Sequence, residues 1–306
     1  MRFKLKRIVV TGASGFIGSH CLPLLEQKGY EIHAFSTQPR SDSENRLTRW
    51  HKIDLFDQKR LNELMAELCP SHLLHLAWYV EPGKCSVSSK NYRWVQASLD
   101  LLMAFSNNGG QRAAMAGSCA EYDWRYSYCK EGLTPLNPNT IYGTCKHSLQ
   151  QMFHAIINKR DISGIWGRIF FLYGPHEHPD RLVSSVIRSL LLDRPADCSH
   201  GNQMRDYLYV KDVADAFVAL LESNITGPVN IASGYPIRLK EIIYNIAKRM
   251  NGEDLVRLGV KETAPDEPDL LVGDTTRLSK EVDWRPKYSL DQGLEETIRW
   301  WENNRL

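Results

Sequence analysis

The sequence predicts an α/β protein whose main domain is a doubly wound parallel sheet, followed by a smaller C-terminal lobe. In the first half of the chain, short apolar runs typical of buried strands alternate with segments of helical periodicity. Residues 8–18 place a buried strand, a turn with three glycines and the start of a helix in immediate succession. Alternation at this spacing favours right-handed crossovers and a Rossmann-like fold.

The expected elements follow in chain order. After a first strand ending at Thr11, further strands are expected at residues 31–35, 51–55, 73–77, 113–117 and 164–170. Helices are expected to end at Pro70 and to cover residues 92–105 and 140–158. Beyond Gly174 the rhythm is irregular, with helical patterns at 182–192, 213–221, 239–250 and 290–301 and a strand pattern at 207–210. We therefore expect a Rossmann-like domain over 1–172 and a smaller lobe over 173–306, with segments near 205–232 returning to the large sheet.

Each glycine of the first turn has a mechanical explanation. Gly12 lets the chain leave the strand sharply, Gly15 lets a pyrophosphate approach bare backbone, and Gly18 lets helix and strand pack closely. Unpaired N–H groups and the helix dipole at the start of the helix favour bound phosphate. The alternative is that the glycines serve packing alone. The position of the motif between strand and helix favours nucleotide binding.

Composition limits the function classes. The chain has 306 residues, 42% of them hydrophobic, and 38 Lys and Arg against 36 Asp and Glu, which does not suggest a nucleic-acid partner. The sequence has no run of about 18 apolar residues, so no membrane span is expected. The basic N-terminus lacks the apolar segment of a secretory signal peptide. Seven cysteines without a C-x-x-C pair favour reduced thiols and a cytoplasmic protein. The histidines of His176-Glu177-His178 have no complete ligand set around them, so no metal is expected.

Tyr142 and Lys146 are the candidate catalytic pair. Four residues apart in a helical pattern, they lie on one face, one turn apart. A neighbouring ammonium is expected to lower the phenol pKa, so that Tyr142 can exchange a proton near neutral pH. Ser118 ends the fifth strand, where its hydroxyl could bond the oxygen that Tyr142 protonates. The alternative is an ordinary surface helix, since Tyr-x-x-x-Lys often occurs by chance.

Together these motifs resemble the extended short-chain dehydrogenase/reductase family, and within it the nucleotide-sugar epimerases, dehydratases and reductases. The resemblance covers nearly the whole chain. Residues 168–175 are similar to the family's R-x-F-N-x-Y-G-P stretch, and residues 205–212 match its R-D-F/Y-x-x-V-x-D stretch. Residues 282–286, Gly293 and Trp300 match its C-terminal signature.

The resemblance implies roles for individual residues. Asp54 and Leu55 would border the adenine, Lys146 would also bond the nicotinamide ribose, and Arg205 would hold the diphosphate of a nucleotide-sugar. The residues expected to bind the cofactor are Gly12, Ser14, Gly15, Phe16, Ile17, Gly18, Ser36, Thr37, Arg40, Asp54, Leu55, Leu76, Ala77, Trp78, Tyr142 and Lys146.

The departures from the family pattern are also informative. Phe171 stands where the family has an Asn that contacts substrate, and Trp94 replaces an Asn common in the helix after the fourth strand. Cys119 and Ala120 replace the Asp-Glu pair of the dehydratases, so the acid and base for water elimination are missing. Glu121 is expected to point elsewhere, and Asp212 is expected to be a helix N-cap.

These observations favour an NADPH-dependent reductase of the 4-keto group of a nucleotide-activated 6-deoxyhexose, resembling deoxysugar 4-ketoreductases. The alternatives are a nucleotide-sugar 4-epimerase that retains NAD and a non-catalytic dinucleotide-binding protein. NADP(H) is preferred because the second strand ends in Ser36 and Thr37, with Arg40 following, where NAD-selective members have an acid. A homodimer is expected through residues 92–105 and 140–158, where Trp94, Leu102, Met152 and Phe153 could be buried between chains or within one chain.

Overall fold

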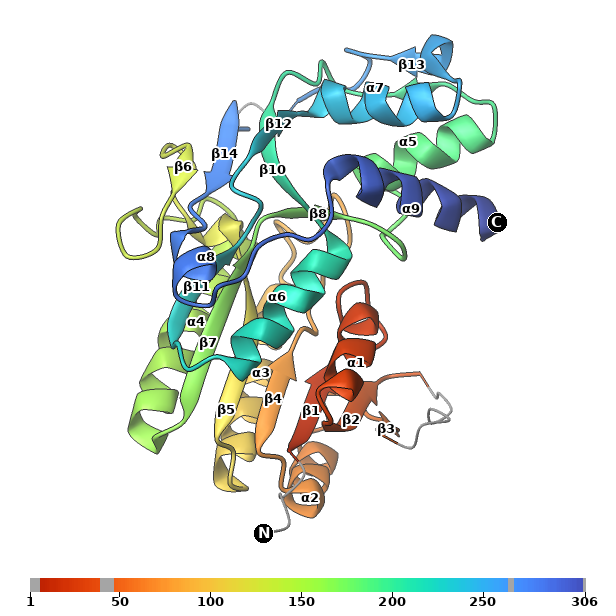
Figure 1. Cartoon of the computed structure of the whole chain (residues 1–306). Coiled ribbons are helices and arrows are strands. Elements are labelled where there is room, and N and C mark those ends of the chain that lie inside the picture. Colours follow the sequence, from red (N-terminus) through yellow and green to blue (C-terminus); the bar gives the residue numbers. More distant parts are fainter. Residues whose placement is uncertain (1–5, 39–46, 264–266, 305–306) are drawn as a thin grey trace.

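The computed structural model describes residues 6–38, 47–263 and 267–304. Its main sheet has seven parallel strands in the order β11-β7-β5-β4-β1-β2-β3. The order doubles back after β3, as in a doubly wound sheet, and β1 and β4 lie side by side at the switch point (Figure 1). The strands are β1 Arg7–Thr11, β2 Glu31–Ser36, β3 Thr48–Lys52, β4 His72–His75, β5 Arg112–Ser118, β7 Ser163–Ile169 and β11 Gly227–Ile231.

Helices cover both faces of this sheet because successive strand residues point to opposite sides. Ile8 and Val10 of β1 join the apolar cluster beneath α1 and α6, while Val9 joins the cluster beneath α2, α3 and α4. Near-continuous burial along β1 is what a sheet covered on both faces requires. These helices are α1 Gly18–Gln27, α2 Gln58–Leu68, α3 Lys90–Asn107, α4 Ile141–Arg160 and α6 Val210–Glu222.

The second lobe is built around a smaller sheet (Figure 1). Its strands run β12-β10-β14-β6, and β8 pairs with β10. Its apolar core is shared by α5, α7 and α9 with residues of β8 and β10. The bounds are β6 Tyr128–Cys129, β8 Phe171–Tyr173, α5 Leu182–Leu191, β9 Ala196–Asp197, β10 Met204–Tyr209, β12 Pro236–Arg238, α7 Leu239–Arg249, β13 Val256–Arg257, β14 Leu270–Gly273, α8 Thr276–Lys280 and α9 Leu290–Asn303, with 3₁₀ turns η1 Cys119–Glu121 and η2 Glu253–Leu255.

The two lobes exchange segments. Within the stretch near 205–232, β11 joins the large sheet beside β7, whereas β10 lies in the small sheet. Conversely β6, which precedes residue 172, pairs with β14 of the small sheet. The chain therefore crosses between the two sheets several times.

Two details differ from the sequence-based expectation. The third strand covers Thr48–Lys52 rather than residues 51–55, because the chain turns at Asp54, whose carbonyl and carboxylate accept the N–H groups of Asp57 and Phe56. Asp212 is not an N-cap: it lies in the first turn of α6, which Tyr209 caps. Its carboxylate accepts the N–H groups of Lys287 (2.9 Å) and Tyr288 (3.2 Å) and so ties the C-terminal segment to α6.

Within the residues described, no helix combines the length and apolarity needed to cross a membrane. Leu102 and Phe153 are buried inside the chain, where α3 and α4 pack on the sheet, so they offer no surface to a second copy. His176 and His178 belong to no cluster of three or more metal-ligating side chains in the described part of the chain.

Candidate active site

The turn after β1 requires glycine. Gly12 has a φ of +65°, and a Cβ there would lie 2.8 Å from the backbone nitrogen of Ala77. A Cβ on Gly18 would lie 2.1 Å from the carbonyl oxygen of Gly12, so only glycine lets α1 approach the turn this closely. In the described structure, no side chain caps the first turn of α1, and that first turn contains no acidic residue. This bare backbone at a helix start fits the pyrophosphate of a dinucleotide.

A buried histidine, missed by the sequence analysis, connects the ends of β1 and β4. Nδ1 of His75 lies 2.6 Å from the Thr11 hydroxyl, which also accepts the Ala77 N–H, and Nε2 lies 2.8 Å from the Ser98 hydroxyl. Burial, with a smaller contribution from Lys146, lowers the pKa of His75 to about 3, so the ring is neutral. The bonds hold the segment Leu76-Ala77-Trp78 against the glycine turn. A histidine within an apolar strand beside that turn is the sequence signal for such a connection.

The end of β2 carries two of the residues expected to select the cofactor. Ser36 is buried, with its Oγ 3.4 Å from Oγ of Ser14 in the glycine turn, while Thr37 is exposed. Arg40 lies outside the described residues. In the turn that follows β3, Leu55 is buried and Asp54 exposed. Among the described residues, the hydroxyls of Ser14 and Ser36, and no carboxylate of β2, lie where β2 meets the turn.

Helix α4 brings the candidate catalytic residues to the end of β5. Thr140 caps α4 by accepting the N–H of Gly143 (3.0 Å), and a Cβ on Gly143 would lie 2.2 Å from the carbonyl oxygen of Ala120. The missing side chain lets the first turn of α4 approach η1. Tyr142 is half-buried in this turn, close enough to Ser118 at the end of β5 for the Ser118 side chain to lower the phenol pKa. The candidate proton donor and the candidate orienting hydroxyl therefore lie near each other.

The electrostatics of the pair differ from the expectation. Burial raises the pKa of Tyr142, opposed by the hydrogen bond from Ser118. Nζ of Lys146 is 6.0 Å from the centre of the Tyr142 ring, and the lysine is itself buried. Burial lowers the pKa of Lys146 to about 7, while Glu121 opposes that change. The expected lowering of the phenol pKa by the ammonium is therefore outweighed by desolvation of both groups.

Glu121 is occupied by structural contacts. The side chain is fully buried and its carboxylate accepts the backbone N–H of Ser118 (2.7 Å), the indole N–H of Trp166 (2.9 Å) and Nε of Arg168 (2.8 Å). These partners face it from β5 and β7. Glu121 thus fixes the end of β5, and with it the backbone that carries Ser118.

Arg205, the expected diphosphate contact, is buried against the second lobe. Its guanidinium donates to Glu267 (2.7 Å) and to the carbonyl of Met204 (2.9 Å), and it lies 5.5 Å from the centre of the Phe171 ring. Phe171 in turn packs on Tyr207, with ring centres 5.6 Å apart. An anionic ligand at Arg205 would have to compete with Glu267.

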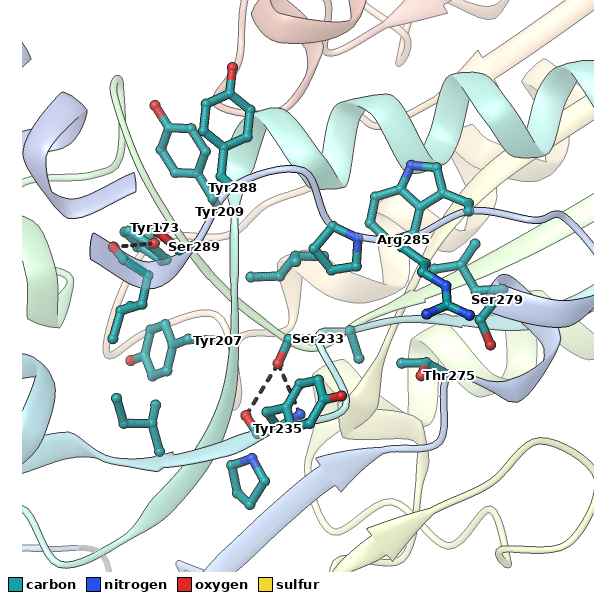
Figure 2. A pocket seen from close by; sticks show the side chains of 18 of the residues that line it. Tyr173, Tyr207, Tyr209, Ser233, Tyr235, Thr275, Ser279, Arg285, Tyr288 and Ser289 are labelled. Carbon is teal, nitrogen blue, oxygen red and sulfur yellow. Dashed lines mark hydrogen bonds between the residues drawn. The ribbon is translucent and has the colours of Figure 1, made fainter. Parts of the chain in front are cut away.

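Figure 2 shows a separate pocket of about 720 Å³ on the second lobe. Tyr207, Ser233, Tyr235 and Arg285 lie around it, contributed by β10, the segment after β11 and the segment before α9. Its lining includes neither Ser118 nor Tyr142 nor Lys146. The candidate catalytic residues lie elsewhere, with Ser118 at the end of β5 and Tyr142 and Lys146 on α4.

A doubly wound sheet, a glycine turn suited to pyrophosphate and a Ser-Tyr-Lys set at the same sheet edge define an NAD(P)-dependent short-chain dehydrogenase/reductase. Residues 8–232 match the model of the NAD dependent epimerase/dehydratase family, and the chain belongs to that family. The remaining quarter of the chain, beyond residue 232, carries α7, α8 and α9 of the second lobe.

Relatives with assigned activities span the full length of the chain. CDP-abequose synthase of Salmonella typhimurium is 24% identical over 312 residues, covering 98% of this chain and 99% of that protein. UDP-glucose 4-epimerase of Rhizobium meliloti is 26% identical over 322 residues, covering 96% of each. The crystal structure of Thermus thermophilus UDP-glucose 4-epimerase in complex with NAD has the same fold, with a TM-score of 0.82, 23% identity and coverage of 97% and 99%.

Proposed function

We propose that this enzyme is an NADPH-dependent reductase of the 4-keto group of a nucleotide-activated 6-deoxyhexose. The observation that carries the proposal is the placement of Tyr142 and Lys146 on one face of α4 near Ser118 at the end of β5, in a sheet whose first turn fits a dinucleotide. Similarity to CDP-abequose synthase over the whole chain supports a deoxysugar substrate. Cys119 and Ala120 supply no acid or base for dehydration at the position where the dehydratases have them.

The chain's own residues would handle the proton and the orientation of the carbonyl. A bound nicotinamide cofactor supplies the hydride to the carbonyl carbon. The Tyr142 hydroxyl gives its proton to the carbonyl oxygen, so the C=O bond becomes CH–OH, and the Ser118 hydroxyl bonds that oxygen and orients it. Because burial raises the pKa of Tyr142, the phenol holds its proton until the oxygen gains charge. Lys146 places a positive charge near the resulting phenolate.

The proposed preference for NADPH rests on the end of β2. Ser36 is buried beside Ser14, and both hydroxyls can donate to a 2′-phosphate, whereas a carboxylate would repel it. Because the Ser14 and Ser36 hydroxyls are uncharged donors, they would not repel the charge of a 2′-phosphate. Comparing kcat/KM for NADPH and NADH measures the preference. Equal values or a preference for NADH would contradict this interpretation of β2.

A nucleotide-sugar 4-epimerase with retained NAD is the second candidate. It is favoured by the full-length similarity to UDP-glucose 4-epimerase and by the shared fold of a structure that binds NAD. An epimerase oxidises and reduces the same carbon, so it consumes no cofactor. A non-catalytic dinucleotide-binding protein would need neither Tyr142 nor the buried Lys146 on the same face of α4.

One experiment separates these candidates. The purified enzyme is incubated with NADPH and a panel of 4-keto-6-deoxyhexoses activated by CDP, dTDP, GDP or UDP, and absorbance at the nicotinamide band is followed. Stoichiometric NADPH oxidation with one panel member supports the reductase. Interconversion of UDP-hexoses without net oxidation, by protein that retains NAD on purification, rejects the reductase in favour of the epimerase.

A further inference from the structure

The indole of Trp78 covers the buried ammonium of Lys146. Nζ of Lys146 lies 3.7 Å from the centre of the Trp78 ring and donates to the carbonyl of Ala116 at 2.8 Å. An ammonium carries three donors and loses its water when buried. Lys146 is only 3% exposed, so the face of the Trp78 ring takes the place of the water that would otherwise surround the ammonium.

Trp78 is itself held from α3. Its indole N–H donates to the side-chain oxygen of Asn91 (2.8 Å), and the amide of Asn91 is anchored on the carbonyls of Cys85 and Ser88. The ring of Trp94 lies 6.1 Å from that of Trp78 and is tilted by 33°. Trp94 is a departure of this chain from the family pattern, so the aromatic support of Trp78 is a feature of this sequence.

The same indole contacts the proton donor. The rings of Trp78 and Tyr142 are 6.4 Å apart in an edge-on arrangement. One side chain therefore contacts both the ammonium and the phenol ring, which are themselves 6.0 Å apart. Since α4 places Tyr142 and Lys146 on successive turns, movement of Trp78 would release both residues.

We propose that Trp78 is a positioning residue, whose indole face holds the Lys146 ammonium near Tyr142 while Asn91 and Trp94 hold the indole. The proposal rests on the roles given to Tyr142 and Lys146 in the proposed function. Trp78 acts through Lys146. Removing the Trp78 indole is therefore expected to change the charge state of Lys146 as well as the rate of the reaction.

The charged groups around Lys146 fix the direction of that change. Glu121 of η1 and Cys145 of α4 favour the ammonium, His75 of β4 is neutral, and burial opposes the charge. An aromatic face also favours the ammonium. Removing the indole without admitting polar groups therefore lowers the pKa of Lys146.

The test compares Trp78→Leu, which keeps an apolar side chain without a π face, with Trp78→Phe, which keeps a smaller π face. Trp300→Leu is the matched control, since Trp300 is a half-buried tryptophan on α9 beside His176. The pKa of Lys146 is measured in each protein by NMR of ¹³Cε-labelled lysine, with the signal assigned by its loss in Lys146→Arg. This measurement needs no substrate.

We expect the pKa of Lys146 to fall by roughly 0.4–1.5 units in Trp78→Leu, by less in Trp78→Phe and not at all in the control. The alkaline limb of the pH profile of kcat/KM is expected to move to lower pH as well, because the active form of the enzyme carries the Lys146 ammonium. An unchanged or raised pKa in Trp78→Leu overturns the proposal. A lowered pKa combined with full turnover of Lys146→Met upholds the contact but refutes the proposed function, so the two failures are distinguishable.

Discussion

Replacing Glu121 by alanine should strongly destabilise the protein. The substitution leaves the guanidinium of Arg168, which is 1% exposed, without its buried counter-ion and removes the acceptor for Ser118 N–H and Trp166 Nε1. Nη2 of Arg168 has no partner in the described structure, so few alternatives exist for the displaced charge. Breaking a buried ion pair from one side typically costs about 3–5 kcal/mol. We expect Glu121→Ala to lower the free energy of unfolding by that amount.

Urea unfolding followed by circular dichroism measures this change. The matched control is Glu281→Ala, which breaks the ion pair with Arg277, two residues four apart on the surface, and should cost about 0.5 kcal/mol or less. A loss below about 1 kcal/mol in Glu121→Ala would refute the structural role, since an unpaired buried guanidinium could not persist so cheaply. Glu121→Gln adds a second criterion: normal stability with abolished turnover would make Glu121 an acid or base instead.

Three further outcomes are expected. Tyr142→Phe should bind the cofactor normally, by fluorescence titration, and lose about 10²–10⁴-fold in kcat, because only the transferable proton is removed; near wild-type kcat would reject the role. The pKa of Lys146 is about 7 in the folded protein and 10.5 in the unfolded chain. Between these two pH values the unfolded chain binds more protons at this residue, so Lys146 makes the free energy of unfolding rise with pH. Lys146→Met should therefore be more stable than wild type near pH 7, with a difference that shrinks towards pH 10.5; a constant difference in urea unfolding across these pH values would contradict the lowered pKa. A homodimer through α3 and α4 is expected in light scattering, and a monomer at micromolar concentration rejects it.

The sequence predicts the large sheet well because strands buried on both faces form apolar runs of unambiguous length. The glycine turn is equally readable, since the φ of Gly12 and the contact of Gly18 with the Gly12 carbonyl leave no room for another residue. The small sheet is harder. Its strands, such as β6 and β8, have two and three residues, too few to show a period.

The candidate site likewise has local features that the sequence predicts and long-range features that it does not. The spacing of Tyr142 and Lys146 is local, so the sequence predicts that they share a helix face. Their pKa values depend on desolvation by distant segments, and the sequence-based expectation of a lowered phenol pKa was wrong for that reason. The contacts of His75 with Thr11 and Ser98 span 64 and 23 residues and could not be read from a local pattern.

The reacting groups are placed by pairs of neighbouring strands rather than by single loops. The contact from Thr11 to His75 joins the ends of β1 and β4, and the contact from Glu121 to Arg168 joins the end of β5 to β7. Since side chains alternate along a strand, a register shift of one residue would turn each partner to the other face of the sheet. The apolar residues of β1 and β4 forbid such a shift, because they fill the cores on both sides. Core packing therefore fixes the register, and the register sets the position of Ser118 relative to the glycine turn.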